Sequence, residues 1–158
     1  MKILFVCTGN TCRSIMAEIM FKEKLLNILG EKYEEKFSVG SAGIVADGIS
    51  SISKNALVVL EDFYKKSFDI IDRKCKLFDG KMIDYYDMIL TVTDRHKEFI
   101  LNNFDCKGKK VFSLCEFVDE GGEIGDPFMG NVEIYKNTFD RLDFLLNKLI
   151  DKLNIFGG

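Results

Sequence analysis

The chain has 158 residues, of which 22 are basic and 25 acidic, so its formal net charge is −3. This length suits a single domain with a sizeable hydrophobic core, and we expect one domain over residues 1–158. The balanced charge argues against a surface for nucleic acid or an anionic membrane, and no apolar run is long enough to span a bilayer. Because no signal peptide precedes the first apolar run, we expect a cytoplasmic protein. We also expect it to act as a monomer.

Short apolar runs alternate with segments of helical periodicity along the whole chain. Strands are predicted over residues 2–6, 37–39, 88–92 and 111–114. Helices are predicted over residues 15–29, 54–64, 94–104 and 132–153. The alternation predicts parallel strands joined by right-handed crossovers and therefore a three-layer α/β fold.

The predicted helices and connections also carry local signals. Ser53 is expected to cap the helix over 54–64, with Phe63 facing inward, and Asp94 is expected to cap the next helix. His96 in that helix is expected to be exposed. The segment 40–53 is rich in glycine and serine and is long for a connection, which suggests a wall of a functional site. The pattern over 65–81 predicts no particular element.

The segment Cys7-Thr8-Gly9-Asn10-Thr11-Cys12-Arg13-Ser14 joins the first predicted strand to the first helix. Such a turn points backbone N–H groups and the positive end of the helix dipole at one place, which makes an anion site without a metal ion. Helix N-termini and arginines favour the thiolate, so Cys7 is a candidate nucleophile. The planar fork of Arg13 could hold two oxygens of a phosphate.

Other residues of this loop suit the same role. Gly9 and Asn10 tolerate the positive φ angles that a tightly wound loop requires. Ser14 could donate a hydrogen bond to the Cys7 sulfur. Taken singly, Cys7 reads as a small buried hydrophobic residue and Arg13 as a surface charge. Their combination between a first strand and a first helix favours nucleophilic catalysis.

A second chemical element is Gly125-Asp126-Pro127-Phe128, which precedes the last helix and contains the only proline of the chain. The proline disfavours helical geometry at Asp126 and stiffens the loop there. A carboxylic acid at this place could protonate a leaving group and later activate water. The alternative is an ordinary turn aspartate.

The five cysteines stand at irregular spacings, so we expect no disulfide framework. The chain contains no Cys-x2-Cys pair, and His96 is its only histidine. We therefore expect no metal site and no cofactor.

The segment from Phe5 to Ser14, followed by Ala17-Glu18, resembles the active-site signature of the low-molecular-weight protein tyrosine phosphatases. Ser41-Ala42-Gly43 and Asp126-Pro127-Phe128 are similar to the supporting serine segment and the general-acid loop of that family. The resemblance implies a four-stranded, flavodoxin-like parallel sheet with the Cys7 loop at the carboxyl ends of its strands. It also implies catalysis by Cys7, Arg13 and Asp126, with support of Asn10 by Ser41. The phosphate would be bound by Thr8, Gly9, Asn10, Thr11, Cys12, Arg13 and Ser14.

Within the family, Thr11 and Phe128 resemble the bacterial protein arginine phosphatases, since tyrosine-directed relatives more often have isoleucine and tyrosine at these positions. Val45 stands where the arginine-specific relatives have an aromatic pocket wall, and Ile15 stands where the family has proline. Thr11, Val45 and Phe128 are therefore the candidate specificity residues. The expected substrates are phosphorylated proteins carrying phosphoarginine, with phosphotyrosine as the alternative.

Three further alternatives stay open. An arsenate reductase of the same fold would need two more cysteines close together, and only Cys75 lies in the expected region. A phosphoprotein-binding module would need neither Cys7 nor Asp126. Cys12 is either a buried residue that fills the helix start or, as the resemblance implies, a redox partner that traps oxidised Cys7 as a disulfide.

Overall fold

The structure is a computed structural model that describes residues 1–156; residues 157–158 of the expected domain lie outside the described part. Four parallel strands form one sheet in the order β2-β1-β3-β4. They are β1 (Lys2–Cys7), β2 (Ser38–Gly43), β3 (Met88–Thr91) and β4 (Lys110–Ser113). The predicted four-stranded parallel sheet is confirmed.

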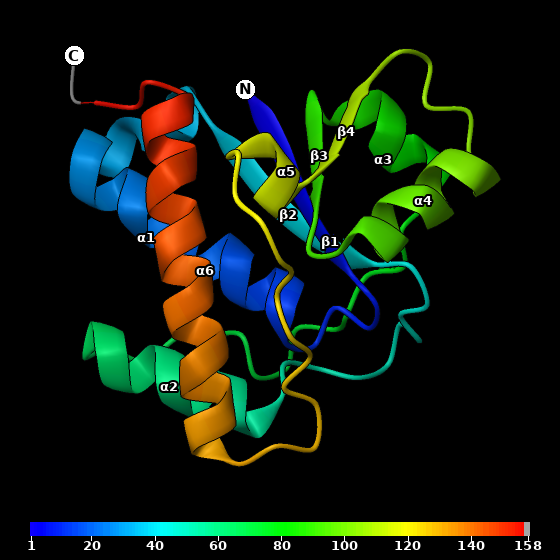
Figure 1. The fold of residues 1–158 in the computed structure, drawn as a ribbon. Helices are drawn as coiled ribbons and strands as arrows, with labels where there is room; N and C mark the ends of the chain where they lie inside the picture. The colour runs from blue at the N-terminus through cyan, green and yellow to red at the C-terminus, as the bar shows by residue number, and fades with distance from the viewer. Residues whose placement is uncertain (157–158) are drawn as a thin grey trace.

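Helices cover both faces of this sheet (Figure 1). The helical elements are α1 (Arg13–Leu29), η1 (Glu31–Glu35), α2 (Lys54–Tyr64), α3 (Gly80–Tyr85), α4 (Asp94–Asn103), α5 (Leu114–Phe117) and α6 (Val132–Lys152). One face packs against α1, α2, α5 and α6, and the opposite face against α3 and α4. The three-layer α/β architecture is therefore confirmed, while η1, α3 and α5 were not foreseen from the sequence.

Strand β1 lies in the middle of the fold and carries both halves of the core. Its side chains alternate, as strand geometry requires. Ile3, Phe5 and Cys7 face the larger cluster formed with α1 and α6, whereas Leu4 and Val6 face the smaller one. A fully buried strand thus ends at Cys7, directly before the anion loop.

Strand β2 is longer than predicted, because Ser41-Ala42-Gly43 continues the strand instead of starting a loop. Phe5, Val6 and Cys7 pair in register with these three residues. Small side chains are needed here, since a Cβ atom on Gly43 would lie 2.5 Å from the carbonyl oxygen of Thr8. The glycine at position 43 therefore reflects close packing against the anion loop.

Two local predictions were wrong and one was confirmed. Thr93, not Asp94, caps α4, because Thr93 has extended backbone angles and its side chain accepts the His96 N–H group. Phe63 is largely exposed, with its ring lying against Phe139 at a centroid distance of 4.6 Å. Ser53 caps α2 as expected, accepting a hydrogen bond from the Ala56 N–H group.

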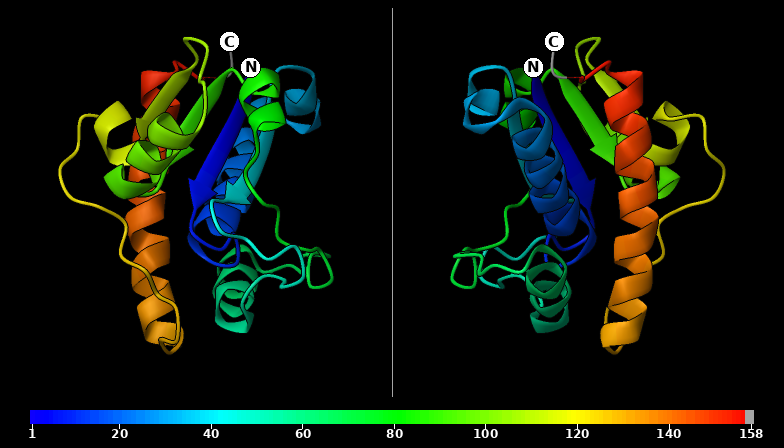
Figure 2. Two further views of the ribbon diagram at one scale, coloured as in Figure 1. Left: turned by 90° about the vertical axis from the view of Figure 1, so that its right-hand side faces the viewer. Right: turned by 90° about the vertical axis from the view of Figure 1, so that its left-hand side faces the viewer.

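The connections that follow the strands converge at one end of the sheet. Beyond β1 and β2, the Ile44 N–H group donates to the Cys7 carbonyl. The long connection between α5 and α6 runs along the outside of the molecule toward that end (Figure 2). This connection contains Asp126, and a crevice at the carboxyl ends of parallel strands is the usual ligand site of such folds.

No helix within residues 1–156 combines the length and the apolar character that crossing a membrane requires.

Candidate active site

The anion loop winds around the Cys7 sulfur at the end of β1. Cys7 is buried, and the backbone N–H group of Asn10 donates to its Sγ atom at 3.2 Å. Asn10 has a φ angle of 58°, whereas Gly9 does not adopt a positive φ. Only one of the two residues expected to need this freedom therefore uses it.

Ser14 lies on the other side of the sulfur, with its Oγ atom 2.9 Å from Cys7 Sγ. The Ser14 oxygen also accepts a hydrogen bond from Asn10 Nδ2 at 2.9 Å. The sulfur thus lies within hydrogen-bond distance of both the Asn10 N–H group and the Ser14 hydroxyl.

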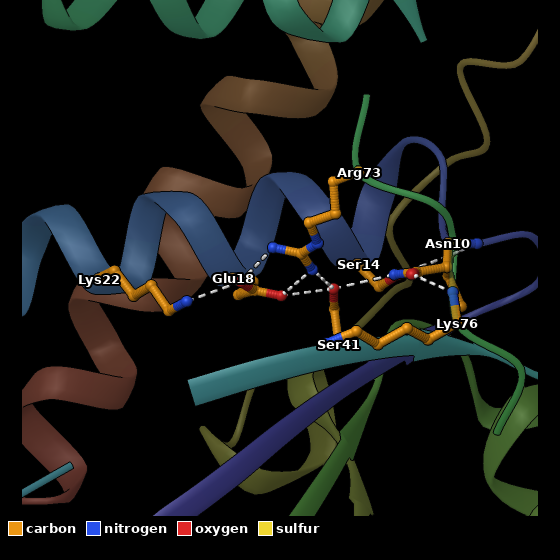
Figure 3. A network of polar contacts seen from close by, with 8 residues as sticks. Asn10, Ser14, Glu18, Lys22, Ser41, Arg73 and Lys76 are labelled. Carbon is orange, nitrogen blue, oxygen red and sulfur yellow. Dashed lines mark hydrogen bonds and ion pairs between the residues drawn. The ribbon is translucent and has the colours of Figure 1, made fainter. Parts of the chain in front are cut away.

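A buried polar network holds Asn10 from behind (Figure 3). Asn10 Nδ2 donates to Ser41 Oγ at 2.9 Å, and Ser41 donates to Glu18 Oε1 at 2.7 Å. The other end of the Asn10 amide accepts from the Lys76 N–H group at 3.0 Å. Ser41 therefore occupies the supporting position expected from the sequence.

Glu18 anchors this network, and sequence reasoning assigned it no role. Arg73 grips the Glu18 carboxylate with two hydrogen bonds of 2.8 and 2.6 Å, and Lys22 adds a third at 2.8 Å. Arg73 comes from the stretch over 65–81 that predicted no element. The only feature of the sequence that could have indicated this role is the presence of an arginine in a segment without helical or strand periodicity.

The pKa of Glu18 reflects this surrounding. Burial alone would raise the pKa, but the hydrogen bonds and positive charges of Arg73 and Lys22 outweigh it and lower the pKa from 4.5 to about 2. A lowered folded-state pKa stabilises the fold at pH values above the unfolded-state pKa. This stabilisation is lost as the pH falls from about 4.5 to about 2.

The Glu18→Gln variant tests this contribution. The substitution leaves Arg73 without its anionic partner, and we expect a loss of about 3 kcal/mol in the free energy of unfolding at neutral pH. Urea unfolding at several pH values should show the difference from the wild type shrinking as the pH falls below 4.5. Asp62→Asn, in an exposed ion pair with Lys65, is the control and should change little. A pH-independent difference would contradict the linkage.

A cavity of about 210 Å³ opens above the sulfur. Its lining residues are Cys7, Thr8, Gly9, Thr11, Cys12, Arg13, Asp126 and Phe128. The Arg13 guanidinium donates to the Ile124 carbonyl at 3.1 Å and lies 3.6 Å from the Asp126 carboxylate. The cavity therefore brings the three predicted catalytic residues together.

Asp126 stands at the mouth of this cavity, with 54% of its side chain exposed. Its Oδ1 atom accepts the Phe128 N–H group at 3.0 Å, which limits the rotation of the carboxylate. The carboxylate is therefore held at the cavity entrance in contact with water.

The three candidate specificity residues occupy different places. Thr11 and Phe128 line the cavity, and Phe128 is exposed at its rim. Val45 does not line it: its side chain is 61% exposed, and its N–H group donates to the Thr8 carbonyl at 3.0 Å. A role of Val45 in specificity stays a prediction.

All five cysteines are free. Cys12 is buried beneath the loop, with its Sγ atom 3.2 Å from the Tyr135 hydroxyl. Burial and the contact with Cys12 raise the pKa of Tyr135 to about 12, so the phenol stays protonated. Sequence reasoning placed Tyr135 on the inner face of the last helix but did not foresee this contact.

The prediction that His96 is exposed was wrong, because it has only 5% exposure on the inner face of α4. Its Nε2 atom lies 2.8 Å from Thr8 Oγ1 in the anion loop, and its Nδ1 atom lies 2.9 Å from Thr93 Oγ1. Burial, together with the charges of Arg13 and Arg95, lowers the pKa of His96 to about 4. The imidazole is therefore neutral at physiological pH.

Residues 2–155 match the model of the low molecular weight phosphotyrosine protein phosphatase family. The chain belongs to this family. The expected fold and enzyme class, a cysteine-based protein phosphatase of low molecular weight, are thereby confirmed.

Members of the family with assigned names are similar over almost the full length. A protein-arginine-phosphatase of Bacillus subtilis is 36% identical over 154 residues, which cover 97% of each chain. The low molecular weight protein-tyrosine-phosphatase PtpB of Staphylococcus haemolyticus is 35% identical over 149 residues, covering 94% of this chain and 97% of PtpB.

A solved structure of a YwlE arginine phosphatase mutant with a phosphorylated active-site serine superposes with a TM-score of 0.81. It is 32% identical, and the match covers 98% of this chain and 96% of that one.

Proposed function

We propose that this phosphatase dephosphorylates arginine side chains of proteins through a phosphocysteine intermediate on Cys7. The observation that carries the proposal is the cavity in which the Cys7 sulfur, the Arg13 guanidinium and the Asp126 carboxylate meet. Hydrogen-bond donors surround the sulfur, and an acid stands at the opening.

Two chemical steps follow from this arrangement. First, Cys7 Sγ attacks phosphorus while the bond from phosphorus to the leaving nitrogen breaks and Asp126 gives that nitrogen a proton. Second, water attacks the phosphocysteine, Asp126 takes a proton from the water, and the sulfur–phosphorus bond breaks to return the thiolate. Ser14 and the Asn10 N–H group stabilise the departing sulfur, because both are within hydrogen-bond distance of it.

Arg13 and the loop amides act on the transferred phosphoryl group. Its transition state carries negative charge on three equatorial oxygens, which a preorganised set of donors stabilises without reorganisation. The network through Ser41, Glu18 and Arg73 keeps the loop in this shape before the substrate arrives. The phosphorylated active-site serine of the related YwlE mutant supports phosphoryl transfer to a protein side chain.

Arginine specificity rests on Thr11. Its hydroxyl lies 3.7 Å from Cys12 Sγ, a weak contact, and so remains available at the cavity wall. A phosphorylated guanidinium is planar and rich in N–H donors. A hydroxyl oxygen can accept hydrogen bonds from these donors, whereas an isoleucine side chain cannot. The Bacillus subtilis relative, named a protein-arginine-phosphatase, supports this choice.

Phosphotyrosine is the second candidate, since the PtpB relative is named a tyrosine phosphatase at nearly the same identity. The arsenate reductase alternative receives no support from these named relatives. The cytoplasmic location, the monomeric state, the single domain and the redox role of Cys12 stay predictions from the sequence.

A side-by-side measurement of kcat/KM on a phosphoarginine peptide and a phosphotyrosine peptide tests the specificity. We expect the wild type to prefer phosphoarginine and Thr11→Ile to reduce that preference about tenfold, the effect of one hydrogen bond to a charged group. Thr138→Val, at a threonine bonded within α6, is the control and should keep the wild-type preference.

A wild-type preference for phosphotyrosine would overturn the arginine assignment but not the mechanism. An unchanged preference in Thr11→Ile would exclude Thr11 as its source.

A further inference from the structure

His96 and Thr8 form a contact that the two chemical steps do not use. Thr8 directly follows the nucleophile, lines the cavity above Cys7 and also borders a neighbouring groove of about 630 Å³ that reaches Arg13 and Asp126. His96 lies behind Thr8 and is buried. A buried imidazole bonded at both nitrogens has a fixed orientation, so it can impose a direction on its partners.

Thr93, the partner of the imidazole on the side away from Thr8, determines which ring nitrogen carries the proton. Thr93 Oγ1 accepts the His96 backbone N–H group at 3.2 Å and lies 2.9 Å from Nδ1 of the imidazole. A proton on Nδ1 would make the Thr93 oxygen accept twice and would leave its own buried proton without an acceptor within residues 1–156. Because such an unpaired group is costly, Thr93 donates to Nδ1 and the imidazole carries its proton on Nε2.

The position of the proton on Nε2 also fixes the hydrogen-bond direction at Thr8 in the anion loop. Nε2–H faces Thr8 Oγ1 at 2.8 Å, so the Thr8 oxygen accepts and its own proton is free. Thr8 is exposed and lines the cavity together with Cys7 and Arg13. A hydroxyl proton directed into an anion site is a further donor for a bound phosphate.

We propose that His96 is a positioning residue, which holds the Thr8 hydroxyl so that its proton points at the phosphoryl group of the substrate. The proposal rests on the phosphatase function proposed above, but it concerns binding and needs no turnover. Its elements are the neutral imidazole, the acceptor role of Thr8 and the place of Thr8 in the cavity wall.

Binding of inorganic phosphate, measured by isothermal titration calorimetry, is the first probe. We expect Thr8→Val to raise the dissociation constant of phosphate about tenfold, the effect of one hydrogen bond to a charged group. The side-chain amide of His96→Asn reaches only the Nδ1 position and should cause a similar loss. The amide of His96→Gln reaches the Nε2 position, so it can donate to Thr8 and should largely restore phosphate binding.

A double-mutant cycle separates positioning from a purely structural role. If His96 acts through Thr8, the Thr8→Val/His96→Asn double variant binds phosphate no more weakly than Thr8→Val. Additive losses, or full phosphate affinity in His96→Asn, would overturn the proposal. Urea unfolding of each variant identifies any that fails to fold.

The tautomer itself is measurable by NMR, because His96 is the only histidine in the chain and its imidazole signals need no assignment. The ¹⁵N-labelled wild type should show the proton on Nε2, with and without inorganic phosphate. A proton on Nδ1 would overturn the proposal. If the wild type shows the Nε2 tautomer and binds phosphate but hydrolyses no phosphopeptide, the proposed function is overturned and the role of His96 is not.

Discussion

Replacing Cys7 with serine is expected to lower kcat by about 10⁴-fold or more on every phosphorylated peptide. A serine hydroxyl must lose its proton to become a nucleophile, and the groups near this position do not take it. The Asn10 N–H group next to the sulfur is a donor only, and the neutral hydroxyl of Ser14 is too weak a base to take the proton.

Steady-state rates and mass spectrometry of quenched reactions check this expectation. The wild type should accumulate a phosphorylated form that disappears with time, and Cys7→Ser should keep the affinity for inorganic phosphate. Cys106→Ser is the matched control, since this half-buried thiol lies outside the cavity. Full activity of Cys7→Ser would rule out the covalent mechanism. A wild type that binds phosphopeptides without turning them over would favour the binding-module alternative.

The Cys7 loop was predictable from the sequence because its information is local. A buried strand, a strand-to-helix turn and an arginine six residues after a cysteine lie within one short segment. The sheet followed for a similar reason, since alternating strands and helices leave few topologies for the chain. The carboxyl end of β1 then places the loop at the edge where ligands bind.

Contacts between distant segments were harder to foresee. Arg73 reaches Glu18 across 55 positions, and His96 reaches Thr8 across 88. Neither contact produces a periodic pattern in the sequence. A single histidine on a short helix is predicted to be a surface residue unless its packing is known. The β2 error had a different origin. Gly43 has low strand propensity, but the nearby anion loop leaves no room for a larger residue.

The residues that sequence reasoning missed all support the anion loop from outside it. Glu18 and Arg73 act on Asn10 through Ser41, Tyr135 contacts Cys12, and His96 contacts Thr8. A loop that must hold several amides at fixed points around an anion needs such support, because preorganised donors cost nothing to align during the reaction. The candidate catalytic residues of the loop could therefore be predicted from the sequence, whereas the distant residues that contact the loop became apparent only in the fold.

Replacing Asp126 with asparagine is expected to cause the second large loss of activity, and the size of this loss depends on the leaving group of the substrate. Asp126→Asn keeps the size of the side chain and its acceptor for the Phe128 N–H group but removes the acidic proton. We expect kcat/KM on a phosphoarginine peptide to fall by about 10²- to 10⁴-fold, the usual contribution of a general acid. A guanidine is a very strong base and leaves poorly unless it is protonated.

Substrates with better leaving groups separate this role from a general disturbance of the loop. An activated aryl phosphate, whose phenolate leaves without a proton, should lose far less than the phosphoarginine peptide in Asp126→Asn. Asp119→Asn, at an exposed aspartate of the same connection, is the control and should lose nothing on either substrate. Equal losses on both substrates would mean that Asp126 holds Arg13, 3.6 Å away, and does not deliver the proton. A small loss confined to the activated phosphate would contradict both roles. The position of Asp126 favours proton delivery, since its exposed carboxylate lines the same cavity as the Cys7 sulfur.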